Sequence, residues 1–84
     1  MRRAARIDSN QRQIVAALRQ IGASVYYIKE PVDLAVGFRK RTVLLEVKAT
    51  GGRLTKSQEE FFQTYSGEAY IVQDVGQALK AVMG

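Results

Sequence analysis

The sequence predicts a small α/β domain with element order α-β-β-β-α-β-α and a mixed sheet flanked by helices. Its 84 residues suffice for one sheet with a few helices. Runs rich in β-branched and aromatic residues alternate with stretches whose apolar residues recur at helical spacing. No repeat or linker interrupts this pattern, so we interpret residues 1–84 as a single domain.

The first helix is predicted over about 9–21. Asp8 and Ser9 are both favourable N-cap residues. From Ile14 onward the apolar residues recur at helical spacing, and Gly22 is a natural stop because glycine adopts the left-handed conformation that ends many helices.

Three strands are predicted next, over 24–28, 32–38 and 42–48. The third contains a run, 43–45, that is apolar on both faces, as in a central strand. A basic tip, Arg39 to Arg41, joins the second and third strands into a hairpin. It lacks the Asn-Gly type of turn signal, so both a two-residue and a four-residue loop fit the sequence.

The second half of the chain predicts a helix, a strand and a final helix. Thr55 is followed three residues later by Gln58, the pattern of a capping box, so a helix is expected from there to about Tyr65. Residues 69–72 are expected to form the fourth strand, and Asp74 to cap the last helix.

The residue types that are missing exclude several kinds of chemistry. The chain has neither His nor Cys, which rules out the usual zinc sites, Ser-His triads, thiolate chemistry and disulfides. An enzyme of this composition would rely on carboxylates, Lys, hydroxyls or a hard cation such as Mg²⁺. The net charge of +5 attracts polyanions, chiefly nucleic acid, although a basic protein without such a partner has the same charge.

The sequence also carries no signal for a membrane. No apolar run approaches the roughly 18 residues of a membrane span. The basic start of the chain lacks the apolar segment of a signal peptide. We therefore expect no membrane association and a cytoplasmic location.

Three polar side chains are predicted to share one face of the sheet. Glu46 and Lys48 are two residues apart on the third strand, so they point to the same side. A two-residue hairpin loop would place Asp33 opposite Glu46, and a four-residue loop would place it opposite Lys48. Either register gathers the three side chains.

Charges in so apolar a strand must be paired, ligated or directed into a cleft, because burying them alone is unfavourable. Two neighbouring carboxylates suit Mg²⁺, with the carbonyl of Val47 as a further oxygen ligand. Lys48 would then hold the attacking water or a phosphate oxygen. The alternative is a cross-strand salt bridge of Lys48 with Asp33 or Glu46 on a solvated face.

These residues resemble a known family. Asp33, followed by Glu46-Val47-Lys48 at the end of an apolar strand, is similar to the PD-(D/E)xK nuclease motif. Together the segments 33–37, 45–48 and 54–61 look like a minimal VRR-Nuc domain, and the resemblance spans about residues 8–72.

The resemblance implies a PD-(D/E)xK nuclease core and an endonuclease that depends on Mg²⁺ or Mn²⁺ and hydrolyses DNA. Asp33 and Glu46 would bind the metal and Lys48 would be the catalytic lysine. Gln58 matches a polar position near the site, although a role restricted to capping its helix fits equally well.

The family also suggests partners. Stand-alone members occur in phages and bacteria, are similar to Holliday-junction resolvases, and are thought to act as dimers on branched DNA. We therefore expect a homodimer acting on four-way junctions in a bacterial or phage-infected cell. The chain departs from the family where Val32 precedes the first acid, with Pro31 one place early. Its first helix also offers Asp8, Asn10 and Gln11 where related nucleases often have a glutamate.

Basic residues outside the cluster are candidates for binding the DNA backbone. Arg39, Lys40 and Arg41 could grip a phosphate, or simply protect the hairpin tip against edge aggregation. Arg53 and Lys56 flank the cluster in sequence and would meet phosphates, unless their loop is only solvated.

Two other hypotheses remain open at this point: a non-catalytic nucleic-acid-binding module with the same fold, and a structural or assembly subunit. The aromatic residues Tyr26, Tyr27, Phe61 and Phe62 are expected in the core or an interface rather than as platforms for stacked bases.

Overall fold

A computed structural model describes residues 9–84, so the predicted capping role of Asp8 lies outside the described residues. The predicted element order is confirmed. The elements are α1 (Ser9–Gln20), β1 (Ser24–Tyr27), β2 (Leu34–Phe38), β3 (Arg41–Val47), α2 (Lys56–Thr64), β4 (Ala69–Val72) and α3 (Val75–Met83).

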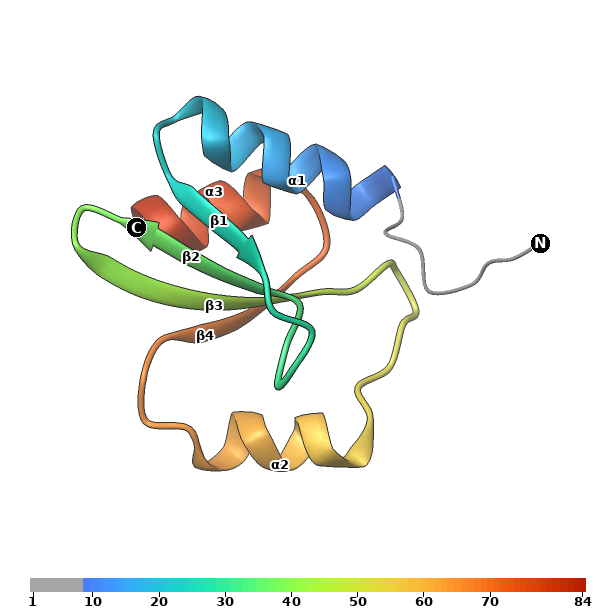
Figure 1. Cartoon of the computed structure of the whole chain (residues 1–84). Coiled ribbons are helices and arrows are strands. Elements are labelled where there is room, and N and C mark those ends of the chain that lie inside the picture. Colours follow the sequence, from blue (N-terminus) through green and yellow to red (C-terminus); the bar gives the residue numbers. More distant parts are fainter. Residues whose placement is uncertain (1–8) are drawn as a thin grey trace.

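The strands form one mixed sheet in the order β1-β2-β3-β4. The first three are antiparallel, and β4 returns parallel to β3 after the α2 crossover. Helices α1 and α3 lie together on one face of the sheet, and α2 lies on the other side (Figure 1). β3 is a central strand, as its apolar run predicted.

The hairpin between β2 and β3 has the two-residue loop. Phe38 pairs with Arg41, which leaves Arg39 and Lys40 as the turn. Both turn residues have positive φ angles, 53° and 66°, as in the type I′ turns that match the twist of a hairpin. This register places Asp33 opposite Glu46, the first of the two predicted arrangements.

The strand limits differ from the prediction at the ends. β1 ends at Tyr27 instead of residue 28, and β3 covers 41–47 instead of 42–48. β2 begins at Leu34 rather than at residue 32. At Asp33 the carbonyl still accepts the amide of Ile28, but the amide donates to the side chain of Glu46 and not to a backbone carbonyl.

The core fills the space between the sheet and the pair α1 and α3. Cross-strand neighbours Val25, Val36 and Val43 form one buried row, and Leu34 with Leu45 form the next. The helices add further fully buried side chains, which are Ile14 and Leu18 from α1 and Val82 from α3.

The helix ends follow their sequence signals. Gly22, with φ of 95°, and the residue after it donate back to Arg19 and Leu18 and so end α1 in a Schellman motif. Thr55 and Gln58 form the predicted capping box of α2. Asp74 caps α3 as expected. Among the described residues, no helix has the length and apolar character needed to cross a bilayer.

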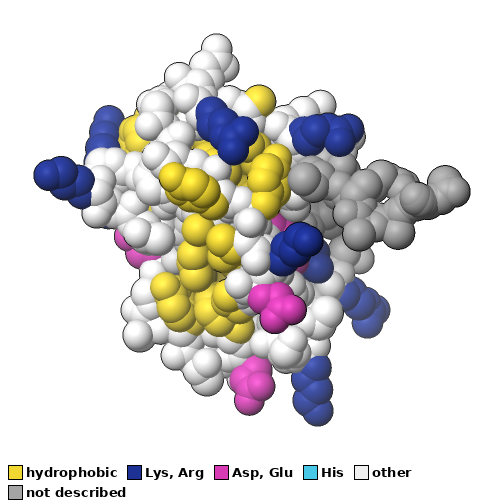
Figure 2. Space-filling view, in the orientation of Figure 1, with side chains coloured by type: hydrophobic (Ala, Val, Ile, Leu, Met, Phe, Trp, Pro, Cys, Tyr) yellow, Lys and Arg dark blue, Asp and Glu magenta, His cyan; other side chains and the backbone are white. Residues whose placement is uncertain are grey.

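The aromatic residues only partly follow the prediction. Tyr26 and Tyr27 are not core residues, because β1 is an edge strand and leaves them 66% and 39% exposed. Phe61 and Phe62 are half-buried and pack edge to face, with Tyr65 stacked on Phe61. Figure 2 shows hydrophobic side chains gathered in a band that extends toward α2.

Candidate active site

The three predicted residues come together where β2 begins and β3 ends. Oε1 of Glu46 accepts a hydrogen bond from the amide of Asp33 at 3.2 Å. Its Oε2 lies 3.1 Å from Nζ of Lys48. The carboxylate of Asp33 in turn accepts the amide of Val47 at 2.8 Å. The two acids and the amine therefore form one connected cluster, which we call the acid–lysine cluster.

The cluster forms because the β2–β3 ladder stops one residue short of it. The last ladder pair is Leu34 with Leu45, so the next position brings Asp33 against Glu46. At that position the side-chain carboxylates of Glu46 and Asp33 accept the amides of Asp33 and Val47, so both amides have an acceptor beyond the last ladder pair. These hydrogen bonds fix both carboxylates relative to the backbone.

The carbonyl of Val47 also lies on the cluster's side of β3. The amide of Val47 points toward Asp33, and a strand residue directs its amide and its carbonyl to the same neighbour. Because β2 does not extend beyond Leu34, that carbonyl faces the region of the two acids instead of another strand residue. It is thus available as the third oxygen donor that the sequence suggested.

Glu46 is the one charged residue that is buried among residues 9–84, at 3% exposure. Burial raises its pKa above the ordinary value, and the nearby charge of Asp33 adds to this rise. Hydrogen bonds from Lys48 and Gln58 oppose the rise without cancelling it. The predicted salt bridge with Lys48 is therefore present, but on a buried face and not on the solvated face of that alternative.

The donor set fits a hard divalent cation. Among residues 9–84, no three His, Cys, Asp or Glu side chains are placed together so that they could hold a metal ion. Two carboxylates with a nearby carbonyl match Mg²⁺, which binds through one or two carboxylates and keeps several waters. A cation here would also offset the repulsion between Asp33 and Glu46 that raises the pKa of Glu46.

Gln58 connects α2 to the cluster. Its Oε1 accepts the amide of Thr55 at 3.1 Å in the capping box, and its side-chain amide lowers the pKa of the nearby Glu46 carboxyl. The predicted capping role is therefore confirmed, and the side chain also lies beside Glu46 of the cluster. The N-terminal end of α2 and the loop between β1 and β2 enclose a hollow of about 360 Å³, lined by Lys29, Glu30, Pro31, Thr55, Ser57 and Gln58.

Sequence reasoning did not single out two residues of this hollow, Lys29 and Glu30. Their nearness to Asp33 in the chain was the available signal. What could not be read from the sequence is that the N-terminal end of α2 closes over the same loop.

The predicted DNA-binding residues divide into two groups. The basic tip is at the far end of β2, five residues from the cluster or roughly 17 Å along the strand. Arg41 there is bound by both carboxylate oxygens of Glu68 at 2.6 and 2.9 Å, and by the carbonyl of Val82 at 2.8 Å. Arg39 lies over the ring of Phe38 at 4.9 Å.

The second group is on the cluster's side of the molecule. Arg53 is exposed in the loop that follows β3, and Lys56 is the first residue of α2. Both therefore follow the strand end that carries the cluster. In the first group, the hydrogen bond between Arg41 and Glu68 lowers the pKa of Glu68.

Comparison of the chain with family models, with curated proteins and with solved structures gives no match. The residues of the cluster and their surroundings are therefore the basis for a function.

Proposed function

We propose that this protein is a metal-dependent endonuclease that hydrolyses phosphodiester bonds in DNA, with a PD-(D/E)xK core of the VRR-Nuc type. The observation that supports it most is the cluster around the buried Glu46, whose carboxylate contacts both the amide of Asp33 and the ammonium of Lys48. A module that only binds a polyanion gains nothing from two carboxylates facing its ligand.

In this proposal Asp33, Glu46 and the carbonyl of Val47 hold Mg²⁺ or Mn²⁺. When bound, such an ion lowers the pKa of a coordinated water and neutralises charge on the scissile phosphate. The hydrogen bonds from the amides of Asp33 and Val47 keep the two carboxylates in place before any substrate arrives. This pre-organisation is what an electrostatic site requires.

Lys48 is the cationic group of the reaction. Its ammonium, on the same side of β3 as Glu46, would orient the attacking water or stabilise the phosphate oxygen as negative charge develops. In the hydrolysis, the water oxygen forms a bond to phosphorus while the bond from phosphorus to the leaving sugar oxygen breaks. Gln58 positions Glu46 through its amide.

The charge distribution favours DNA as substrate. The net charge of +5 attracts the DNA backbone, and Arg53 and Lys56, which follow the cluster's end of β3, would contact phosphates of a strand bound at the site. Arg39 and Lys40 at the far end of the sheet would contact a more distant phosphate, with Arg41 holding the tip in position. We propose a homodimer on branched, four-way-junction DNA as the working form.

The test is incubation of the protein with labelled four-way junction, flap and linear duplex DNA in Mg²⁺ or Mn²⁺. We expect cleavage, strongest on the junction, and its loss in Lys48→Ala and Asp33→Asn. Glu60→Gln, which removes a charge from an exposed site on α2, serves as control. Salt-sensitive binding without cleavage in either metal would instead support a non-catalytic binding module, and no binding at low salt would support a structural subunit.

A further inference from the structure

The outer edge of β4 is open. The carbonyls of Glu68 and Val72 accept the amides of Leu44 and Lys48, so alternate residues of β4 direct their backbone groups to β3. Ala69 and Ile71 therefore direct theirs outward. No hydrogen bond among residues 9–84 engages these outward groups, and β4 has neither a charged residue nor a proline to protect its edge.

The opposite edge of the sheet is protected. On β1, the residues Val25 and Tyr27 direct their backbone groups outward, because the adjacent position, Ile28, hydrogen-bonds to Asp33. The guanidinium of Arg19 donates to the carbonyl of Val25 at 3.0 Å and so occupies that edge. At the β4 edge a comparable bond, from the side chain of Asn10 to the carbonyl of Gln73 at 2.9 Å, lies just past the end of the strand and leaves the outward groups of Ala69 and Ile71 open.

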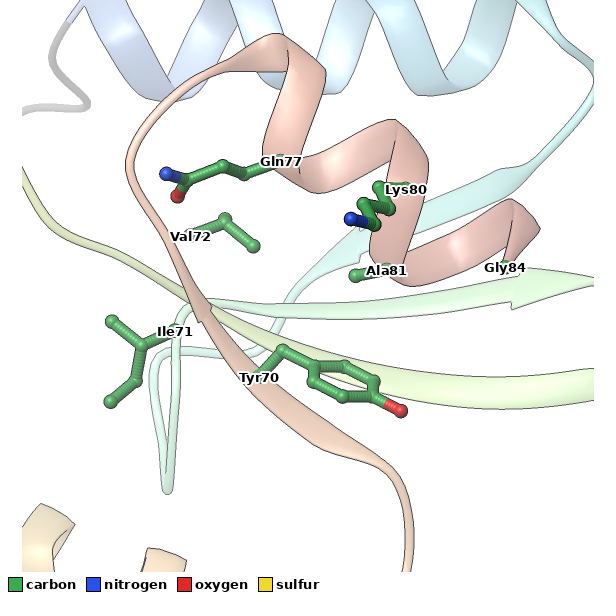
Figure 3. Close-up of a pocket in the computed structure, with 7 residues that line it drawn as sticks. All are labelled: Tyr70, Ile71, Val72, Gln77, Lys80, Ala81 and Gly84. Carbon is green, nitrogen blue, oxygen red and sulfur yellow. The ribbon is translucent and has the colours of Figure 1, made fainter.

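An apolar hollow of about 420 Å³ adjoins the open edge, between β4 and α3. Tyr70 and Val72 line it from the strand, and Lys80 and Ala81 line it from the helix (Figure 3). Tyr70 and Ile71 remain 41% and 45% exposed beside it. Open backbone groups next to uncovered apolar side chains are the features of a site for strand addition.

We propose that the occupant is a second copy of this chain, whose β4 pairs antiparallel with the first across a two-fold axis near Tyr70. Ala69 of each copy then lies opposite Ile71 of the other. The four outward amides of the two copies donate hydrogen bonds to their four outward carbonyls. Small Ala69 beside large Ile71 suits close packing on one face. On the other face the two Tyr70 rings lie side by side, and each covers the other copy's hollow.

The area argues for a weak dimer. A standard interface buries about 800 Å² per partner, roughly one-seventh of this chain's 5643 Å², and involves about 20–30 residues a side. Seven residues line the hollow, so this edge provides a smaller contact. The net charge of +5 on each copy opposes association at low salt. Dimerisation should therefore depend on concentration and strengthen with added salt, whereas DNA binding weakens.

This inference specifies the dimer of the proposed function but does not depend on DNA cleavage. Pairing across a two-fold axis keeps the cluster sides of both sheets on the same surface. One strand spacing from β4 to β3 in each copy, the spacing between the two β4 strands, and the one-residue offset of Glu46 from Tyr70 place the two Glu46 residues roughly 16 Å apart before twist is considered. Both sites would then face one DNA molecule.

Single cysteines test the pairing, because the natural chain has none. Tyr70→Cys would place two thiols directly opposite each other, at Cα separations within disulfide range. Tyr26→Cys provides an exposed thiol on the other edge strand as matched control. After mild oxidation at about 100 μM protein, we expect at least about tenfold more covalent dimer from Tyr70→Cys than from Tyr26→Cys.

A second variant removes the interface without a cysteine. Ile71→Lys places charge on the open edge and should lower the dimer fraction of the otherwise native chain in sedimentation velocity, with an unchanged circular dichroism spectrum. Equal cross-linking of the two cysteine variants, or a monomeric mass for the natural chain up to millimolar concentration, would overturn the inference. A dimer that cleaves no DNA would leave it standing and refute the nuclease proposal alone.

Discussion

The ammonium of Lys48 lies 3.1 Å from Oε2 of Glu46, which is buried at 3% exposure. A carboxylate in that position depends on its partner, because burial alone raises its pKa. The same pair that stabilises this end of β3 would hold water and phosphate in the proposed reaction. Stability and activity are therefore linked at this one contact, and variants of the pair separate them.

Lys48→Met removes the charge and keeps the length of the side chain. Glu46 then stays buried without its ammonium, and we expect the free energy of unfolding at pH 7 to fall by about 1–3 kcal/mol. The double variant Glu46→Gln with Lys48→Met should recover part of this loss, because no unpaired charge remains. Urea unfolding measures both. An unchanged stability of Lys48→Met would show that the pair is not a structural contact.

Gln58→Glu separates the two roles of this residue. A glutamate still accepts the amide of Thr55, so the capping box is retained. It loses the amide donor and adds a negative charge beside Glu46, and we expect DNA cleavage to fall at least about tenfold. Thr55→Ala is the matched control, since it should cost about 1 kcal/mol of stability through the cap and leave the amide of Gln58 in place. Full cleavage activity in Gln58→Glu would refute a site role.

Glu68 makes stability depend on pH in acid solution. Its hydrogen bond with Arg41 lowers its pKa below the ordinary value of about 4.3. A group with a depressed folded pKa contributes stability above its unfolded pKa, and this contribution is lost as pH falls through the folded pKa. The difference in unfolding free energy between the natural chain and Glu68→Gln should therefore be larger at pH 7 than at pH 3. Equal differences at both pH values would argue against this ion pair.

The hairpin turn carries strain that a glycine would relieve. Lys40 has a φ of 66°, a conformation that costs a residue with a side chain roughly 1–2 kcal/mol. We expect Lys40→Gly to raise the free energy of unfolding by about 0.5–1 kcal/mol and the thermal midpoint by a few degrees. Lys40→Ala removes the same charge but keeps Cβ, so it should give no such gain. Thermal unfolding by circular dichroism distinguishes the two.

Most of the fold follows from local signals. The capping box at Thr55 and the stop at Gly22 act within a few residues, so their sequence patterns suffice to predict the helix ends. The length of the hairpin loop could not be predicted from local signals, because Arg39 and Lys40 adopt a turn in which Asn and Gly are the usual residues. There the register is set by the buried faces of β2 and β3 instead.

The position of the cluster could be predicted from the sequence because strand alternation and the β2–β3 register decide which side chains share a face. Glu46 and Lys48 share a face by spacing alone, and Asp33 joins them in either register considered. The partner of Arg41 was not predictable, since Glu68 lies 27 residues away and meets it only through the crossover to β4. The exposure of Tyr26 likewise depends on which strand is at the edge.

The most direct test of the central claim is Mn²⁺ binding followed by thermal unfolding. At about 100 times the dissociation constant, a bound ion stabilises the folded chain by about 2.7 kcal/mol, which corresponds to a rise of roughly 10–20 °C for a domain of this size. We predict that rise for the natural chain and for Lys48→Met, and its loss in Asp33→Asn and Glu46→Gln. No rise in the natural chain, or an equal rise in all four proteins, would contradict a cation site at Asp33 and Glu46.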